Sequence, residues 1–286
     1  MALVVIASGG LGVVTAATGV SLWPAALVLG VGLFAVLRRP LRRWRVSSQP
    51  LPADIRRWIE GHVPMYRRLS PPDRDRFDRD VLFVLDEWTF EGVRGVEVND
   101  ELRASVAAGV AVLLHGRPDW ELSDRHTVLF YPERFNDDYL TGDRGDFDGM
   151  AHAQGPVIIS VEASRRDWQH SDSGHNVVLH ELAHLLDFKD SFADGVPDLL
   201  EGASRPAWDD LVDREMRRIR QGHSILRRYG ATNRAEFFAV AVENFFERPD
   251  VMASRHPELF AALTAFFGYD PRLETAEKVG EQSNPH

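Results

Sequence analysis

Apolar residues recur at the three- and four-residue spacing of amphipathic helices along most of the chain after position 50. Two short runs of β-branched and aromatic residues, Val128 to Tyr131 and Val157 to Val161, predict strands instead. The stretch from Arg205 to Tyr229 predicts one helix or two. Further helices are predicted over Ile55 to Leu69, Asp73 to Trp88, Ala104 to Leu114 and Pro257 to Phe267. This pattern is typical of an α+β domain that is mostly helical and contains a small mixed sheet.

The N-terminal segment shows a different pattern, because residues 1 to 37 carry no charged side chain. One apolar stretch opens at Val4, a second covers Leu22 to Leu37, and a basic cluster follows directly. A bilayer core needs about 20 apolar residues, so the segment predicts a transmembrane anchor, either one long helix or a tight hairpin. The segment lacks the basic front end of a cleaved secretion signal. The basic cluster consists of Arg38, Arg39, Arg42, Arg43 and Arg45.

The basic cluster also predicts where the protein lies. The positive-inside rule keeps arginines beside an anchor in the cytoplasm. We therefore expect a protein of the cell membrane, bound to it through the N-terminal segment. Its larger domain, which carries the candidate chemistry, would lie in the cytoplasm. The alternative is a wholly cytoplasmic protein.

These patterns divide the chain into three parts. Residues 1–45 form the anchor with its basic flank, 46–272 the main domain, and 273–286 a polar, mobile tail. Within the main domain, 46–120 is a helical N-terminal part and 121–272 carries the candidate chemistry. The formal net charge is -10, and the basic flank leaves the main domain more acidic still, which argues against nucleic acid as a partner. The chain has no Cys, which excludes disulfides and thiolate metal ligands.

The most informative motif is HELAH at residues 180–184, inside an uninterrupted apolar run. His180 and His184 lie one turn apart on the same face of a helix, so both imidazoles can bind one metal ion. Glu181 can reach a water on that metal and act as general base, as in zinc hydrolases. The apolar neighbours predict a buried helix, whose polar groups a metal would satisfy. The alternative is a coincidental match on an ordinary core helix.

A zinc site needs a third protein ligand, and residues 229–247 are the best place to seek it. Thr232 or Asn233 can cap a helix whose apolar residues recur at helical spacing. Glu236 and Glu243 lie two turns apart on one face of that helix, and spacing alone does not choose between them. Alternatively, Glu236 closes a capping box with Asn233.

Together these segments resemble the Mlc titration factor A family of zinc peptidases. The residues that carry the resemblance are His180-Glu181-x-x-His184-x-x-Asp187 and Tyr229-Gly-x-Thr-Asn-x-Ala-Glu236-Phe-Phe-Ala. The chain is also similar to the catalytic domain of the lethal-factor type metalloproteases. The likeness spans most of the chain after the N-terminal segment and includes stretches at 66–70, 90–95 and 155–160. It implies a zincin-like metallopeptidase domain with one zinc ion, Glu236 as its third ligand, and Tyr229 as a residue that assists catalysis.

The chemistry of a zinc site gives each of these residues an expected role. Zinc lowers the pKa of its bound water to about 7, and Glu181 takes the proton of that water to hydrolyse a peptide bond. Tyr229 donates a hydrogen bond to the developing oxyanion. Asp187 is either a carboxylate that orients a His ring or an exposed helix-terminal acid. Glu243 is a weaker candidate for the orienting role.

Other features near the motif are interpreted more simply. By resemblance, the strand that begins at Val157 is an edge strand that pairs with an extended peptide substrate; the alternative is a short core strand. His152 and His175 are taken as loop residues, because a lone His is rarely a ligand. The Arg-rich pairs along residues 214–228 predict a solvated helix face.

The sequence therefore predicts a zinc-dependent metallopeptidase that acts on a peptide or protein substrate, as an aminopeptidase or an endopeptidase. The resemblance implies an alternative from another class. This is a regulatory binding protein that sequesters a transcriptional repressor, with peptidase activity secondary. The two functions are compatible, and the intact set of chemically active residues favours catalysis.

Overall fold

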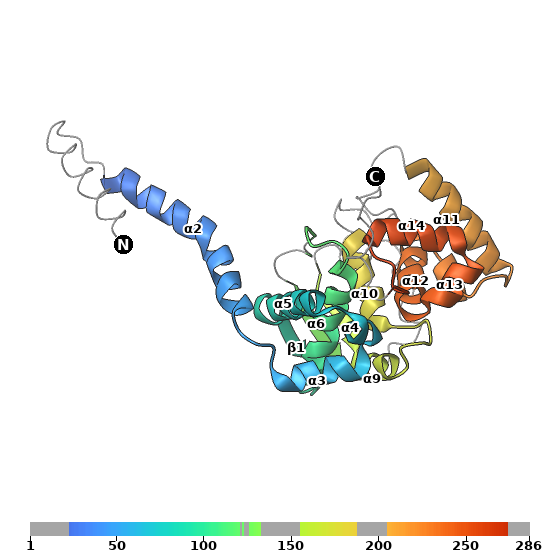
Figure 1. The fold of residues 1–286 in the computed structure, drawn as a ribbon, viewed down its shortest axis with the longest axis horizontal. Helices are drawn as coiled ribbons and strands as arrows, with labels where there is room; N and C mark the ends of the chain where they lie inside the picture. The colour runs from blue at the N-terminus through green and yellow to red at the C-terminus, as the bar shows by residue number, and fades with distance from the viewer. Residues whose placement is uncertain (1–22, 121, 123–125, 133–154, 188–204, 274–286) are drawn as a thin grey trace, which may run out of the picture. The chain divides into compact units, whose positions relative to one another are not determined.

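The computed structural model describes residues 23–120, 122, 126–132, 155–187 and 205–273 (Figure 1). The chain divides into two compact units, Met1–Pro50 and Leu51–His286. In the first unit, the described residues contain one helix, α2 (Trp23–Ser47). The second unit contains the remaining described helices and a small sheet.

Helix α2 corrects the prediction for the N-terminal segment. Its apolar part ends at Leu37, and Arg38 and Pro40 follow within the same helix. Among the described residues, no helix combines the length and the apolar character that a bilayer crossing requires. The predicted transmembrane segment is therefore wrong for the described part of the chain, and so are the membrane as a partner and the cell membrane as the location. The stretch that opens at Val4 lies outside the described residues.

Four helices form the N-terminal part of the second unit. They are α3 (Ala53–His62), α4 (Pro64–Arg68), α5 (Pro71–Glu87) and α6 (Asp100–Leu114). The single helix predicted up to Leu69 is two helices, because Val63 is extended in front of Pro64, whose ring disfavours a helical predecessor. Helix α6 begins earlier than predicted, because Asn99 caps it by accepting a 3.0 Å hydrogen bond from the Leu102 amide.

The sheet contains the strands β1 (Thr89–Gly92), β2 (Thr127–Tyr131) and β3 (Val157–Ser160), in that order. All described pairings are parallel, so the predicted mixed sheet is corrected to a parallel one. The register places Val128 of β2 between Phe90 of β1 and Val157 of β3. Strand β1 was not predicted, because most of its side chains are exposed and show no apolar alternation. Backbone pairing with β2 holds it in the sheet.

Among the described residues, six helices and a 3₁₀ turn follow the sheet. They are α9 (Val161–Gln169), α10 (Val177–Asp187), α11 (Arg205–Arg220), the 3₁₀ helix η2 (Arg228–Ala231), α12 (Arg234–Glu247), α13 (Pro249–Arg255) and α14 (Pro257–Phe267). The predicted strand end at Val161 is instead the start of α9, because the Ser160 hydroxyl accepts a hydrogen bond from the Ala163 amide. The stretch predicted as one helix or two is α11 followed by a loop and η2.

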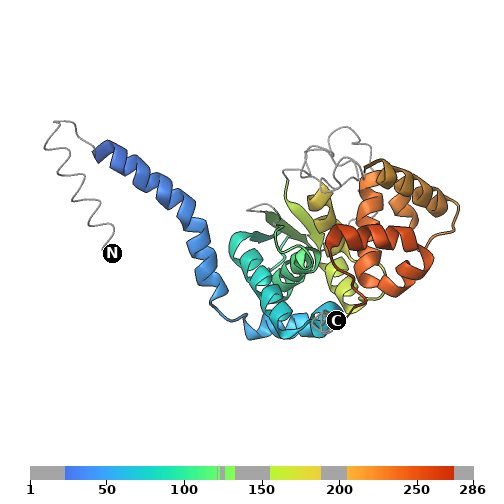
Figure 2. The same ribbon diagram turned by 45° about the horizontal axis from the view of Figure 1, so that its top comes forward.

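Helix α10, which carries the HExxH motif, lies between α6 and α12 (Figure 1). Gly109 of α6 permits its close approach, since a Cβ there would lie 2.9 Å from Leu182 Cδ1 and from Val178 Cγ1. Leu182 and Val178 are both fully buried. Strand β3 also contacts α10, and Figure 2 shows it in the yellow-green part of the ribbon. The core of the second unit therefore holds this helix from several sides.

Candidate metal centre

Helix α10 presents two histidines to one point. His180 is buried and His184 is partly buried, and their ring centroids lie 4.9 Å apart in an edge-to-face arrangement. The start of the helix is held by Asn176, whose Oδ1 accepts hydrogen bonds of 3.1 Å from the amides of Val178 and Leu179. Amides at the start of a helix have no partner within the helix, and the buried Asn176 side chain satisfies two of them. This cap holds the start of α10 in place and thereby orients the motif.

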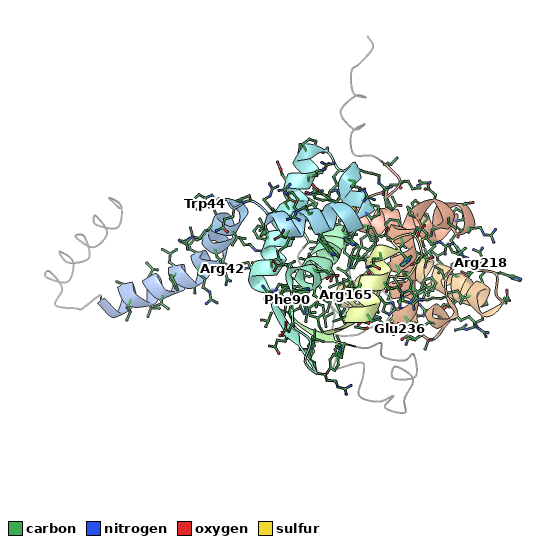
Figure 3. All side chains as sticks on the ribbon, turned by 90° about the horizontal axis from the view of Figure 1, so that it is seen from below. Arg42, Trp44, Phe90, Arg165, Arg218 and Glu236 are labelled. Carbon is green, nitrogen blue, oxygen red and sulfur yellow. The ribbon has the colours of Figure 1, made fainter. Side chains whose placement is uncertain are left out.

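Glu236 brings a carboxylate to the same point from α12. Its Oε2 lies 3.0 Å from His180 Nε2 and 3.6 Å from His184 Nε2. One ligand atom from each of these three residues lies within 4.8 Å of the others. Asn233 caps α12 by accepting a hydrogen bond from the Glu236 amide, as a capping box would require. The Glu236 carboxylate is directed at the histidines, so cap and candidate ligand coexist in this segment; Glu236 is labelled in Figure 3.

Glu243 lies behind the centre, two turns further along α12. Its Oε1 lies 2.7 Å from His180 Nδ1, and its Oε2 accepts a 2.8 Å hydrogen bond from the Asn176 amide. The side chain is fully buried. Glu243 therefore ties one nitrogen of His180 to α12 and also ties down the start of α10. In this position Glu243 can orient the His180 ring, a role for which the sequence made it a weaker candidate than Asp187.

The close charges shift the pKa values of this cluster. Burial lowers the pKa of His180, but hydrogen bonds to Glu236 and Glu243 outweigh it and raise that pKa to about 10. Burial favours a neutral Glu236, yet the hydrogen bonds and charges of both histidines hold the pKa of its carboxyl far below its usual range. Burial likewise opposes ionisation of Glu243, and His180 and Arg227 overcome it, so its pKa is lowered. The site thus concentrates negative charge around an imidazole.

The donor set fits a divalent transition metal such as zinc. Two imidazole nitrogens and one carboxylate oxygen are a common ligand set for catalytic zinc. The bond from His180 Nδ1 to Glu243 leaves Nε2 as the nitrogen that faces His184 and Glu236. The carboxylates beside the His180 ring favour a positive charge there, whether a proton or a metal ion. A metal ion and a proton therefore compete for His180 Nε2.

Glu181 and Tyr229 lie next to the three candidate ligands. Glu181 follows His180 on α10, and its charge contributes to the raised pKa of both His180 and Tyr229. The Tyr229 ring centroid lies 6.0 Å from that of His180. Burial, and then the charge of Glu236 and a hydrogen bond to it, raise the pKa of the Tyr229 hydroxyl above its usual value. The structure thus brings all five predicted site residues to one region.

Sequence reasoning missed three residues around the centre. Arg227, assigned to a solvated face, donates a hydrogen bond to Glu243, while His175, taken as a loop residue, lies 2.9 Å from Arg227 Nη1. Asp167 of α9 accepts a 2.9 Å hydrogen bond from the Val177 amide at the start of α10. The position of Arg227 two residues before Tyr229 was the only local signal for it.

Two other predicted residues lie partly or wholly outside the described part of the chain. Asp187 ends α10, and its side chain lies outside the described part. His152 also lies outside the described residues. Their predicted roles, as an orienting carboxylate or exposed acid and as a loop residue, stay predictions.

Comparison with known proteins gives the family. Residues 38–268 match the glucose-regulated metallo-peptidases M90. The uncharacterized protein slr2042 of Synechocystis sp. is 28% identical over 249 residues, which cover 81% of this chain and 90% of that protein. Mlc titration factor A of Yersinia pestis (strain Pestoides F) and that of Yersinia pseudotuberculosis (strain YPIII) are each 26% identical over 253 residues, which cover 80% of this chain and 89% of theirs. The predicted resemblance to the Mlc titration factor A family is thereby confirmed, and this protein belongs to the family of glucose-regulated metallo-peptidases M90.

Proposed function

We propose that this protein is a zinc-dependent peptidase in which His180, His184 and Glu236 hold one zinc ion. The observation that carries the proposal is the convergence of one ligand atom from each residue within 4.8 Å. Membership of a metallopeptidase family supports a metal ion. The choice of zinc rests on the ligand types, two imidazoles and one carboxylate, which leave a further position open.

The residues around the centre would divide the hydrolysis of a peptide bond between them. A bound zinc ion would supply Lewis acidity toward a water molecule and the substrate carbonyl. Glu181 would take a proton from the attacking water and pass it to the leaving amine. Tyr229 would donate a hydrogen bond to the carbonyl oxygen as negative charge develops there. Strand β3, at one edge of the described sheet and in contact with α10, would pair with the extended substrate backbone.

The experiment combines metal analysis with digestion of a peptide library. The wild type should contain one zinc ion, while His180→Ala and His184→Ala should lose it. Glu181→Gln should keep zinc and lose most hydrolysis, because the ligands remain and the proton acceptor is removed. His223→Ala, which changes an exposed histidine of the loop after α11, is the matched control. Full zinc occupancy in both ligand variants would contradict the site, and the position of the cleaved bonds would distinguish aminopeptidase from endopeptidase action.

A second function, binding of a transcription regulator, is favoured by the name that relatives carry, Mlc titration factor A. The Glu181→Gln variant separates the two functions, since it lacks the proposed base and keeps the surface. If the variant reduces the binding of a repressor to DNA to the same extent as the wild type does, sequestration is the function. If only the wild type reduces it, and the repressor is cleaved, the peptidase is the function.

A further inference from the structure

Arg227 reaches the candidate metal centre from the loop that precedes η2. Its Nη2 donates a hydrogen bond to Glu243 Oε1 and lies 3.3 Å from His180 Nδ1. His180 Nδ1 is itself 2.7 Å from the same Oε1. Two nitrogen donors cannot bond to one another, so the short separation between them follows from sharing one acceptor. The guanidinium and the imidazole therefore both depend on the position of the Glu243 carboxylate.

The same guanidinium contacts two further groups. Its Nη1 lies 2.9 Å from His175 Nε2, and His175 Nδ1 lies 3.3 Å from Asp167 Oδ2. The Cζ atom of Arg227 lies 5.6 Å from the centroid of the Tyr229 ring, within the range of a cation–π interaction. One side chain thus touches the carboxylate behind a candidate ligand and the ring of the candidate oxyanion donor.

The burial of Glu243 explains why a fixed positive charge is needed here. The Glu243 side chain is 0% exposed, and an ionised carboxylate in such a place is costly unless it is paired and fully hydrogen-bonded. The Asn176 amide bonds its Oε2 but carries no net charge. Arg227 supplies positive charge together with His180, and its planar guanidinium can bond Glu243 and His175 while facing the Tyr229 ring. A lysine, with a single ammonium group, could not make these contacts together.

We infer that Arg227 is a positioning residue that fixes Glu243, and through it the His180 ring, and that holds the Tyr229 ring in place. The inference deepens the proposed function and rests on it. Arg227 lies behind the ligands, so its effect on hydrolysis passes through His180 and Tyr229. It couples the orientation of a candidate ligand to that of the group proposed to stabilise the oxyanion.

The first test compares Arg227→Ala and Arg227→Lys with Arg228→Ala, an exposed arginine at the next position, in the full chain. Zinc affinity is measured by competition with a chromophoric chelator, and kcat and KM on a peptide that the wild type cleaves. Arg227→Ala should weaken zinc binding by about 10-fold, the lower end of the loss that removal of a ligand's outer partner causes, because Arg227 acts on His180 through Glu243. At saturating zinc it should still lower kcat with little change in KM. Arg227→Lys should restore zinc affinity but not kcat, because the ammonium supplies charge without the planar group that faces Tyr229.

A double-mutant cycle tests whether Arg227 acts through Glu243. In the Glu243→Gln background, Arg227→Ala should weaken zinc binding little further, because the shared contact is already lost. Fully additive losses would overturn the inference. So would wild-type zinc affinity and kcat in Arg227→Ala.

Proton NMR of the metal-free protein gives a readout that needs neither zinc nor peptidase activity. The Nδ1 proton of His180, donated to a buried carboxylate, should give a downfield resonance in the wild type and in Arg228→Ala. This resonance should shift or broaden in Arg227→Ala. If the alanine variant does not fold, Arg227→Gln takes its place and should show the same change. An unchanged resonance in the folded variant would overturn the inference, even if the wild type binds no zinc and the proposed function fails.

Discussion

The Nδ1 atom of His180 lies 2.7 Å from Oε1 of Glu243, while Nε2 of the same ring faces Glu236 at 3.0 Å. The two glutamates lie two turns apart on α12, so one helix presents a carboxylate to each nitrogen of one imidazole. A buried carboxylate on Nδ1 fixes the orientation of the ring and leaves Nε2 for a metal. The two glutamates therefore have different expected roles although they share one helix face.

Substitution of the two glutamates should reveal this difference. Glu243→Gln should weaken zinc binding by about 10- to 100-fold, because it removes the charge behind His180 and keeps the ligands. Glu236→Gln should weaken it more, since a direct ligand is lost. Chelator competition on both purified variants measures the order. The opposite order would show that Glu243 is the ligand and Glu236 the outer carboxylate.

Gly109 should be the position of α6 where added volume disturbs α10. Gly109→Leu should destabilise the protein by about 1–3 kcal/mol, because its side chain would overlap Leu182, which lies within the motif, and Val178, which lies just before it. Urea denaturation measures the loss. The control is Gly61→Ala in α3, where a Cβ meets nothing within 4 Å and a helical glycine is replaced. That variant should be neutral or more stable by up to about 1 kcal/mol. Equal effects at the two positions would contradict the packing argument.

Glu247 should make the metal-free protein less stable as pH rises. Burial, opposed by a hydrogen bond from Asn176 and reinforced by the charge of Glu243, raises its pKa from 4.5 to about 8. The folded state therefore holds a proton that the unfolded state has lost between these pH values. The stabilisation is complete below about pH 4.5 and is lost as the pH approaches 8, with a slope of about 1.4 kcal/mol per pH unit.

The variant Glu247→Gln isolates this contribution, because glutamine keeps the shape and cannot ionise. The stability of the wild type relative to the variant should fall between pH 5 and pH 8, as measured by urea denaturation at about unit intervals of pH. Parallel stability curves for the two proteins would show that Glu247 is ionised in the folded state.

The buried pair of His256 and Glu215 should anchor the loop that leads to Tyr229 in η2. His256 Nδ1 lies 2.6 Å from Glu215 Oε2, and its Nε2 lies 3.2 Å from Ser224 Oγ on that loop. His256→Ala should destabilise the protein by about 3 kcal/mol in thermal or urea unfolding, because it leaves the buried Glu215 carboxylate with Arg218 alone.

An exposed pair that also joins α11 to the C-terminal helices provides the control for His256→Ala. Arg214 and Glu258 lie 2.6 Å apart, with side chains 49% and 72% exposed. Glu258→Gln should change the free energy of unfolding by less than about 0.5 kcal/mol, since exposed ion pairs contribute little. Comparable losses in the two variants would show that burial does not set the value of these pairs.

Local patterns determined the helices that carry the candidate chemistry. His180 and His184 share a face because their spacing is one helical turn, whatever surrounds the helix. A cap at Thr232 or Asn233 and the apolar spacing after it likewise predicted α12, because capping and periodicity act over a few neighbouring residues. The break before Pro64 was missed, although the proline signal for it was also local.

Only the tertiary structure decided which groups meet. The packing of α12 against α10 directs Glu236 to Nε2 of His180 and Glu243 to Nδ1, and spacing along α12 could not distinguish them. Strand β1 is held by backbone hydrogen bonds to β2, and such pairing does not require an apolar pattern in the residues of β1. The apolar N-terminal run suggested a membrane span, yet α2 continues through the arginines that follow it. Arg227 was assigned to a solvated helix face because the segment around it is rich in arginine. In the folded protein it instead contacts Glu243 and the Tyr229 ring, and only the tertiary structure brings Glu243 to it.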